Sequence, residues 1–386
     1  MATMLKPIRT VLTAALLTVA TYGVATAAMQ ADHPDTYTVK KGDTLWDIAG
    51  RFLKKPWLWP EIWQANPQVK NPHLIYPGDV LSLAYLDRVA VQEGPREEAP
   101  INAIPLAEIE PFLKNLRVVD EFEQLPYVVA FEEDRLRGVD GQVVYVRGLA
   151  DAQPGQRYAV VRPNQLNRSV DPDRCCENSG RRSEVLDARG HRSWGVERLW
   201  SYQIPHGKGE FLGYELEQIT TGTISRGEGD DVEVSTLLID QKGREVRAGD
   251  RLIAVDAQPY DLQFMPHPPS QQLDYDKARV IAVADAVATG GPRDVIALSV
   301  GAQDGIDNGT VLSTWRVGSE EVDRVAVGYD RSPDAVGGGN HVRLPDEFSG
   351  HVLIFRTFDR VSYGLVMDAL RPTRLGYALK HPDATR

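Results

Sequence analysis

Two patterns of apolar and polar residues divide the chain. Between residues 37 and 83 a short alternating stretch is followed by helical periodicity and then by alternation again. From about residue 126 onward, short alternating runs follow one another towards the C-terminus. Alternation is typical of strands and a 3.6-residue period of amphipathic helices. We therefore expect an α+β unit of the order strand, helix, helix, strand, followed by a mainly-β region.

The first half of the front unit has clear local signals. Residues 37–40 alternate as a strand, Gly42 lies in the turn that follows, and Thr44 can cap a helix. Asp47 stands three residues after Thr44, as in a capping box. One helical face is expected to be buried, and it consists of Leu45, Ile48, Ala49, Phe52 and Leu53.

Prolines frame the second helix of this unit. Pro56 ends the first helix, Pro60 lies in the first turn of the second, and residues 80–83 return as a strand. Trp57 and Trp59 lie between these prolines, and we interpret them as core side chains rather than sugar-stacking ones. A unit of about 50 residues has a small core, which explains its heavy use of Leu, Ile and Trp.

The order and spacing of these residues resemble the LysM domain, a module that binds peptidoglycan and chitin. The resemblance is carried by residues 37–39, 42–46, 48–49, 66–67 and 74–81. It implies a shallow groove for glycans that contain N-acetylglucosamine, formed by the loop after the first strand and the loop before the second. The glycan-binding residues carried over are Gly42, Asp43, Thr44, Leu45, Asn71, Pro72, His73, Leu74 and Ile75. Leu45 and Ile75 are equally expected as core residues.

The β-rich region contains an internal repeat. Residues 213–255 and 278–316 both read strand, turn, strand, polar loop, glycine turn and strand. The glycine turns are centred on Gly249 and Gly309, and residues 138–162 contain a further copy. Strands at this spacing predict small antiparallel barrels or sandwiches. The repeat corresponds either to three related β units or to two domains, one of them shared across an insertion.

Composition shifts suggest the boundaries of the domains. We expect a signal peptide at 1–28, a LysM domain at 35–85, a linker at 86–105, a β-rich region at 106–260 with a polar insertion at about 164–200, and a second β-rich domain at 261–386. The linker is rich in Pro and Glu, a short helix is expected after residue 106, and residues 330–347 form a second polar loop.

The N-terminus and the charge indicate the compartment. Lys6 and Arg9 precede an apolar stretch at 11–28 that ends in small residues, as in a secretory signal peptide. The alternative, a membrane anchor, fits less well because Thr, Tyr and Gly interrupt the stretch. A formal net charge of −11 gives no general attraction to nucleic acid or to anionic lipid. We expect an exported periplasmic protein that is not integral to a membrane.

Candidate catalytic groups are sparse. Cys175 and Cys176 are the chain's two cysteines, and they lie in a polar stretch without the helical pattern that an activated thiol needs. The eight histidines are scattered and form no His-Glu-x-x-His motif, and no Gly-x-Ser-x-Gly sequence occurs. A glycosidase needs only two carboxylates, and because these have no fixed spacing in a sequence, spacing does not exclude this enzyme class. We expect no enzymatic activity, no metal site and no cofactor.

The architecture as a whole resembles the type IV pilus secretin-associated proteins of Gram-negative bacteria, whose C-terminal region is related to a flagellar ring protein. Residues 55–79, 249–252 and 304–312 carry this resemblance. It implies a scaffold that grips peptidoglycan and meets the outer-membrane secretin, with several copies forming an oligomer around the secretin ring. The alternatives are a wall-binding component of another envelope assembly, such as a flagellar one, and a peptidoglycan hydrolase.

Overall fold

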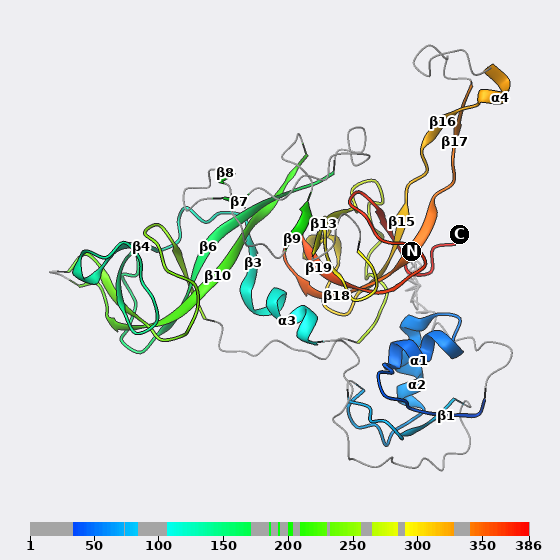
Figure 1. The fold of residues 1–386 in the computed structure, drawn as a ribbon, viewed down its shortest axis with the longest axis horizontal. Helices are drawn as coiled ribbons and strands as arrows, with labels where there is room; N and C mark the ends of the chain where they lie inside the picture. The colour runs from blue at the N-terminus through cyan, green and yellow to red at the C-terminus, as the bar shows by residue number, and fades with distance from the viewer. Residues whose placement is uncertain are drawn as a thin grey trace, which may run out of the picture.

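The computed structural model describes residues 34–72, 74–83, 106–170, 185–186, 192–193, 200–203, 209–229, 232–255, 265–284, 290–327 and 340–385. In this part of the chain a small helical module is followed by two seven-stranded antiparallel sheets (Figure 1). The expected α+β unit and mainly-β region are thereby confirmed. None of the helices described is long and apolar enough to cross a membrane. The expected signal peptide and linker lie outside the described residues.

The module has the predicted order of elements. They are β1 (Thr36–Thr38), α1 (Leu45–Phe52), the 3-10 helix η1 (Pro56–Leu58), α2 (Trp59–Gln64) and β2 (Val80–Ser82). β1 pairs with β2 in antiparallel fashion. Thr44 caps α1 through a capping box with Asp47, as predicted. Trp57 and Trp59 are 4% and 3% exposed, in agreement with their interpretation as buried side chains.

The first large sheet follows helix α3 (Leu106–Asn115) and closes on itself. Its strands are β3 (Leu116–Val119), β4 (Tyr127–Phe131), β5 (Val143–Arg147), β6 (Arg157–Arg168), β10 (Phe211–Arg226), β11 (Ser235–Ile239) and β12 (Arg251–Ala254), with the 3-10 helix η2 (Glu132–Asp134) after β4. Their order is β11-β5-β4-β12-β6-β10-β3, and β11 also pairs with β10. This pairing makes a closed barrel of all the strands except β3, and Val144, Val160 and Leu237 lie in its core.

The second large sheet closes in the same way. Its strands are β9 (Trp200–Gln203), β13 (Val280–Ala284), β14 (Val295–Leu298), β15 (Val311–Arg316), β18 (Glu347–Thr357), β19 (Ser362–Ala369) and β20 (Ala378–Lys380), with the 3-10 helix η3 (Ala302–Asp304) after β14. Their order is β20-β15-β18-β19-β14-β13-β9. A bridge between Arg279 and Ala378 joins the β13 side to β20 and closes the second barrel, leaving β9 outside the ring.

The two barrels have the same topology. Numbered along the chain within each barrel, the strands follow the ring order 5-2-1-6-3-4 in both. The third and sixth strands are each preceded, two residues earlier, by a glycine with positive φ: Gly155, Gly249, Gly309 and Gly376. A residue with a side chain would be strained in this backbone conformation. The predicted repeat therefore corresponds to half a barrel, and the fourth copy, around Gly376, was not recognised in the sequence.

Three segments differ from the sequence-based expectations. β6 extends to Arg168, so the polar insertion does not begin at Asn164; the side chains of Asn164, Gln165 and Asn167 are buried. The polar sequence of this end of β6 was mistaken for a loop, because buried amide side chains cannot be told from loop residues in a sequence. β9 belongs to the second sheet, although it precedes residue 260, where the second β-rich domain was expected to begin. Of the insertion, β7 (Val185–Leu186) and β8 (Arg192–Ser193) form a small pair, and Cys175 and Cys176 lie outside the described residues.

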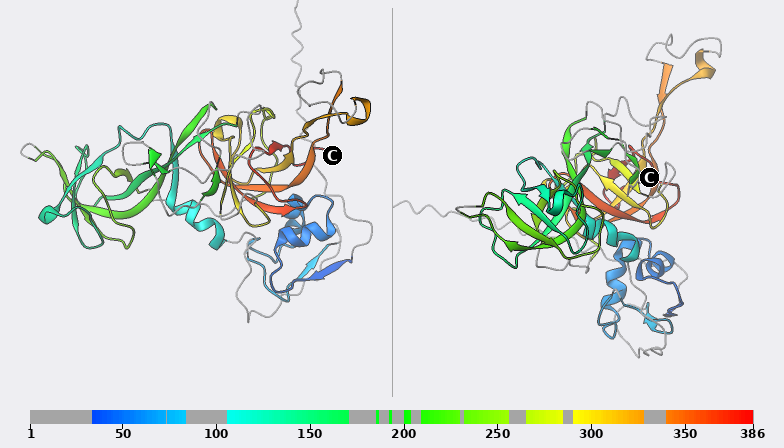
Figure 2. Two further views of the ribbon diagram at one scale, coloured as in Figure 1. Left: turned by 45° about the horizontal axis from the view of Figure 1, so that its top comes forward. Right: turned by 60° about the vertical axis from the view of Figure 1, so that its left-hand side comes forward.

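The expected loop at 330–347 is partly an arm. β16 (Glu320–Val322) pairs with β17 (His341–Arg343), and α4 (Arg324–Val327) follows β16. The arm projects away from the second barrel in Figure 1, and Figure 2 shows the two barrels side by side.

A buried carboxylate joins the two barrels. Glu215 on β10 accepts hydrogen bonds from Tyr363 Oη (2.5 Å) and Trp200 Nε1 (2.8 Å), which belong to the second sheet. It also accepts one from Asn164 Nδ2 on β6 (3.1 Å). Phe112 of α3 packs against Trp200, with ring centroids 5.0 Å apart. Burial raises the pKa of Glu215 to about 7, although these three donors act to lower it.

Candidate functional site

The two loops expected to form the glycan groove meet at the end of β1. Val39 N–H donates to Asp79 C=O, and Gly78 N–H donates to Val39 C=O, both at 2.8 Å. These bonds tie the turn before β2 to the start of the turn after β1. The fold thus brings together the two loops that contain residues 42–45 and 71–75, which the sequence placed on either side of a groove.

The first loop presents backbone at Gly42. This residue has a φ of 89°, is exposed, and has no atom within 4 Å of the position that a Cβ would occupy. A glycine is therefore favoured by the backbone conformation and not by crowding inside the module. The open space beside it allows a ligand to approach the backbone closely.

Asp43 has an internal role that the sequence did not reveal. Its carboxylate accepts hydrogen bonds from Tyr37 Oη (2.7 Å), Lys40 N–H (2.8 Å) and Arg51 Nη2 (2.9 Å), and the residue is 5% exposed. Arg51 also donates to Tyr37 Oη. Burial raises the pKa of Tyr37, and the hydrogen bond to Asp43 adds to the effect. The Asp43 side chain locks β1, the turn and α1 together.

Thr44 and Leu45 are also occupied within the module. Thr44 Oγ1 accepts the Asp47 N–H (3.1 Å) and donates to Asp47 Oδ2 (2.8 Å). Leu45 is 1% exposed and lies in the core, which is the alternative that the sequence left open. The side chains of Asp43, Thr44 and Leu45 therefore position the Gly42 turn.

The second loop is built in a similar way. Leu74 N–H donates to Asn71 C=O (3.0 Å), which forms a turn, and Ile75 is fully buried. Pro72 is buried, Asn71 and Leu74 are half-buried, and His73 lies outside the described residues. Among the candidate side chains described, those of Asn71 and Leu74 are neither in the core nor part of a helix cap.

The arrangement suits recognition of a neutral, hydrogen-bonding ligand. It offers an exposed glycine turn next to a second turn with a half-buried amide and a half-buried apolar side chain. Backbone groups can hydrogen-bond acetamido and hydroxyl groups, while apolar side chains can cover the faces of sugar rings. Within the described residues, no group of three or more His, Cys, Asp or Glu side chains is arranged to hold a metal ion.

Comparison with known proteins identifies the module. The family model of the LysM domain matches residues 37–84. An uncharacterized protein of Bacillus subtilis (strain 168), YqbP, is 43% identical over 60 aligned positions, and the alignment covers 13% of this chain and 27% of that protein. The chain thus spans about a quarter of the length of the curated relative it matches. Residues 37–84 are a LysM domain, which indicates binding of peptidoglycan or another carbohydrate.

Proposed function

We propose that this protein is a non-catalytic scaffold that binds the glycan strands of peptidoglycan through residues 37–84. The observation that carries the proposal is the exposed Gly42 turn, which follows directly on Val39, the residue bonded to the turn before β2, within a LysM domain. The ligand is an N-acetylglucosamine-containing glycan, held by backbone groups of the two turns and covered by Leu74. Because the groove is shallow, a single module is expected to bind weakly.

Gly42→Asn is the sharpest test of this groove. Asn tolerates positive φ better than other side chains, and nothing inside the module lies near the new Cβ. The variant should therefore fold, with a loss of about 1 kcal/mol or less, while its side chain occupies the space proposed for the ligand. Gly141→Asn is the matched control, because Gly141 also has positive φ (80°) and open space, but it lies in the first barrel.

The assay is pelleting of the full chain with purified cell-wall sacculi. The parent protein and Gly141→Asn should pellet, and Gly42→Asn should stay mostly in the supernatant. Retention of Gly42→Asn at the parental level would refute the groove. The supernatant also tests for catalysis: we expect no soluble muropeptides or glycan fragments, and their release would identify a hydrolase instead.

We further propose that the β region binds a partner in the envelope, so that the protein links this partner to peptidoglycan. The resemblance at residues 55–79, 249–252 and 304–312 supports the outer-membrane secretin of a type IV pilus machine, with the protein periplasmic and oligomeric around the ring. Several weakly binding LysM domains on one ring would together bind the cell wall tightly, because the first contact raises the effective concentration of glycan for the others. Co-purification with the secretin tests this assignment, and recovery with a flagellar ring instead would favour the alternative assembly.

A further inference from the structure

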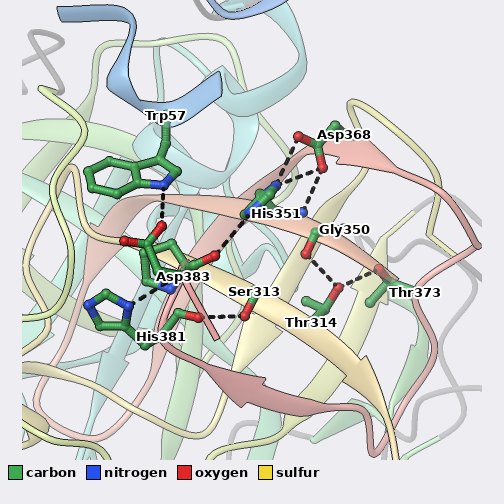
Figure 3. Close-up of polar contacts among 10 residues, drawn as sticks. Trp57, Ser313, Thr314, Gly350, His351, Asp368, Thr373, His381 and Asp383 are labelled. Atoms are coloured by element: carbon green, nitrogen blue, oxygen red, sulfur yellow. Dashed lines mark hydrogen bonds and ion pairs between the residues drawn. The ribbon is translucent and has the colours of Figure 1, made fainter. Parts of the chain in front are cut away.

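The LysM domain contacts the second barrel through the segment that joins α1 to α2. Trp57 lies in the Pro-Trp-Leu-Trp-Pro segment at residues 56–60, and its Nε1 donates to Asp383 Oδ1 at 3.3 Å. Lys55 Nζ lies 2.6 Å from Asp383 Oδ2. Asp383 follows β20 near the end of the chain, 326 residues after Trp57, and Figure 3 shows the indole directed at its carboxylate.

A second contact lies beside the first. The indole ring of Trp46, on α1, meets the ring of His351, on β18, edge to face, with centroids 6.4 Å apart. Trp46 is only 2% exposed. His351 is held in place, because its Nδ1 lies 3.0 Å from both carboxylate oxygens of Asp368. Two tryptophans of the LysM domain thus rest on side chains of the second barrel.

The receiving surface is held by contacts within the second barrel and its C-terminal tail. Ser313 Oγ, on β15, donates to His381 C=O at 2.8 Å, and Asp383 N–H donates to His381 Nδ1 at 3.1 Å. The Pro382 carbonyl lies 3.4 Å from His351 Nε2. These bonds hold the C-terminal tail on the barrel, so the Asp383 carboxylate is an oriented acceptor and not the end of a loose strand.

Apolar packing is continuous across the same region. One cluster of buried side chains contains the LysM core, α3 and residues of the second barrel, among them Leu353, Phe355 and Tyr363. In Figure 1, α1 lies on the side of the domain nearest the second barrel, and β1 lies on the far side. Contacts at Trp46, Lys55 and Trp57 leave Gly42 exposed.

We propose that residues 55–57 and Trp46 form a docking element for the second barrel, and that the LysM domain binds its glycan while docked. His351 and the tail at 381–383 form the receiving surface. The linker then does not set the orientation of the glycan groove, which is fixed relative to the barrels. The docking contact stands independently of the ligand, whereas its consequence for glycan binding rests on the proposed function.

Reversing the charge at position 383 tests the contact in the full chain. Asp383→Lys removes the acceptor of the Trp57 indole N–H and places a cation against Lys55. The equilibrium constant for docking should therefore fall at least about tenfold. Asp383→Lys combined with Lys55→Glu restores an ion pair and should recover part of the loss. Trp63→Phe is the control, because the Trp63 indole N–H bonds to Val69 C=O inside the domain.

Two dyes report the docking by energy transfer. They are attached to cysteines introduced at the exposed positions Gln64 and Lys277. Cys175→Ser and Cys176→Ser remove the native thiols, which would otherwise also be labelled. We expect one narrow population for the parent and for Trp63→Phe, a broad one for Asp383→Lys, and a narrower one for the double variant. An unchanged narrow population in Asp383→Lys would overturn the docking proposal.

Sacculus pelleting of the same variants separates this inference from the proposed function. Asp383→Lys should pellet like the parent, because the groove is open in the docked state. A several-fold gain in pelleting on undocking would overturn simultaneous docking and binding, and would indicate that the barrel covers the site. Failure of the parent itself to pellet would refute the proposed function while leaving the energy-transfer result on docking intact.

Discussion

Replacing Glu215 by Gln should make the barrels insensitive to a pH change that weakens the parent protein. Glu215 is completely buried, and the groups that touch it are the Tyr363 hydroxyl, the Trp200 indole N–H and the Asn164 amide. None of these donors is a cation. Burial therefore dominates and raises the pKa from its ordinary value of 4.5 to about 7.

The size and sign of the change in the free energy of unfolding with pH follow from this pKa. Below about pH 4.5 the carboxyl is protonated in both the folded and the unfolded chain, and its contribution to stability is complete. Between about pH 4.5 and 7 the unfolded chain loses this proton while the folded chain retains it, so stability falls as the pH rises. At about 1.4 kcal/mol per pH unit, the free energy of unfolding falls by about 3 kcal/mol and then stays level.

Gln is close in shape to the protonated acid and can keep the contacts. Its Oε1 can accept from Tyr363 and Trp200, and its amide can donate to Asn164 once the Asn164 amide has turned over. The free energy of unfolding of Glu215→Gln should equal that of the parent near pH 4.5 and exceed it by about 3 kcal/mol near pH 8. Urea unfolding followed by circular dichroism of the β structure measures this difference at each pH.

Glu217→Gln provides the matched control on the same strand. Glu217 is partly exposed and lies 2.6 Å from Arg244, so this substitution should change stability by less than about 1 kcal/mol, without a step between pH 4.5 and 7. A difference between Glu215→Gln and the parent that stays constant from pH 4.5 to pH 8 would refute the reasoning. It would mean that Glu215 is already solvated or paired in the folded protein.

Two further predictions concern buried carboxylates that serve as locks. Asp43→Ala should lower the stability of the LysM domain by about 2–3 kcal/mol, because three donors lose a buried charged acceptor; thermal unfolding of the domain's tryptophan signal measures this loss. Arg162→Ala should cost about 3–5 kcal/mol, because the fully buried Asp250 loses its cationic partner and keeps the Arg247 N–H as a donor. Arg157→Ala, which removes an exposed contact to Asp240, should cost less than about 1 kcal/mol in the same urea titration; equal losses for the two arginines would contradict this assignment.

Local chemistry made the LysM domain predictable. The capping box at Thr44, Pro60 in the first turn of α2 and the turn at Gly42 act over a few residues, and each was found where the sequence placed it. Pro56 was expected to end the first helix, but α1 already ends at Phe52 and Pro56 begins η1. The half-barrel repeat was visible for the same reason, since a glycine with positive φ precedes the last strand of each half. Alternation predicted strands but not their partners.

Contacts between distant segments were beyond the reach of local patterns. Closure of the first barrel depends on β10 pairing with β11 and of the second on Arg279 facing Ala378, which no periodicity encodes. Asp43 was expected at the groove because of its position in the motif, whereas its carboxylate accepts hydrogen bonds from Tyr37 and Arg51 inside the domain. The docking of Trp57 on Asp383 joins segments that are 326 residues apart, and the sequence indicated only that Trp57 is a core side chain.

The central claim is that the two turns of the LysM domain bind a glycan, and one titration tests it directly. The full chain is labelled with ¹⁵N-glycine and titrated with soluble glycan fragments of digested peptidoglycan. The amide signals of Gly42, in the first turn, and of Gly78, between the second turn and β2, should shift in a saturable way, while those of Gly141 and Gly155 in the first barrel stay in place. Signals of Gly42 and Gly78 that do not move at millimolar glycan, or shifts confined to the barrel glycines, would contradict the claim.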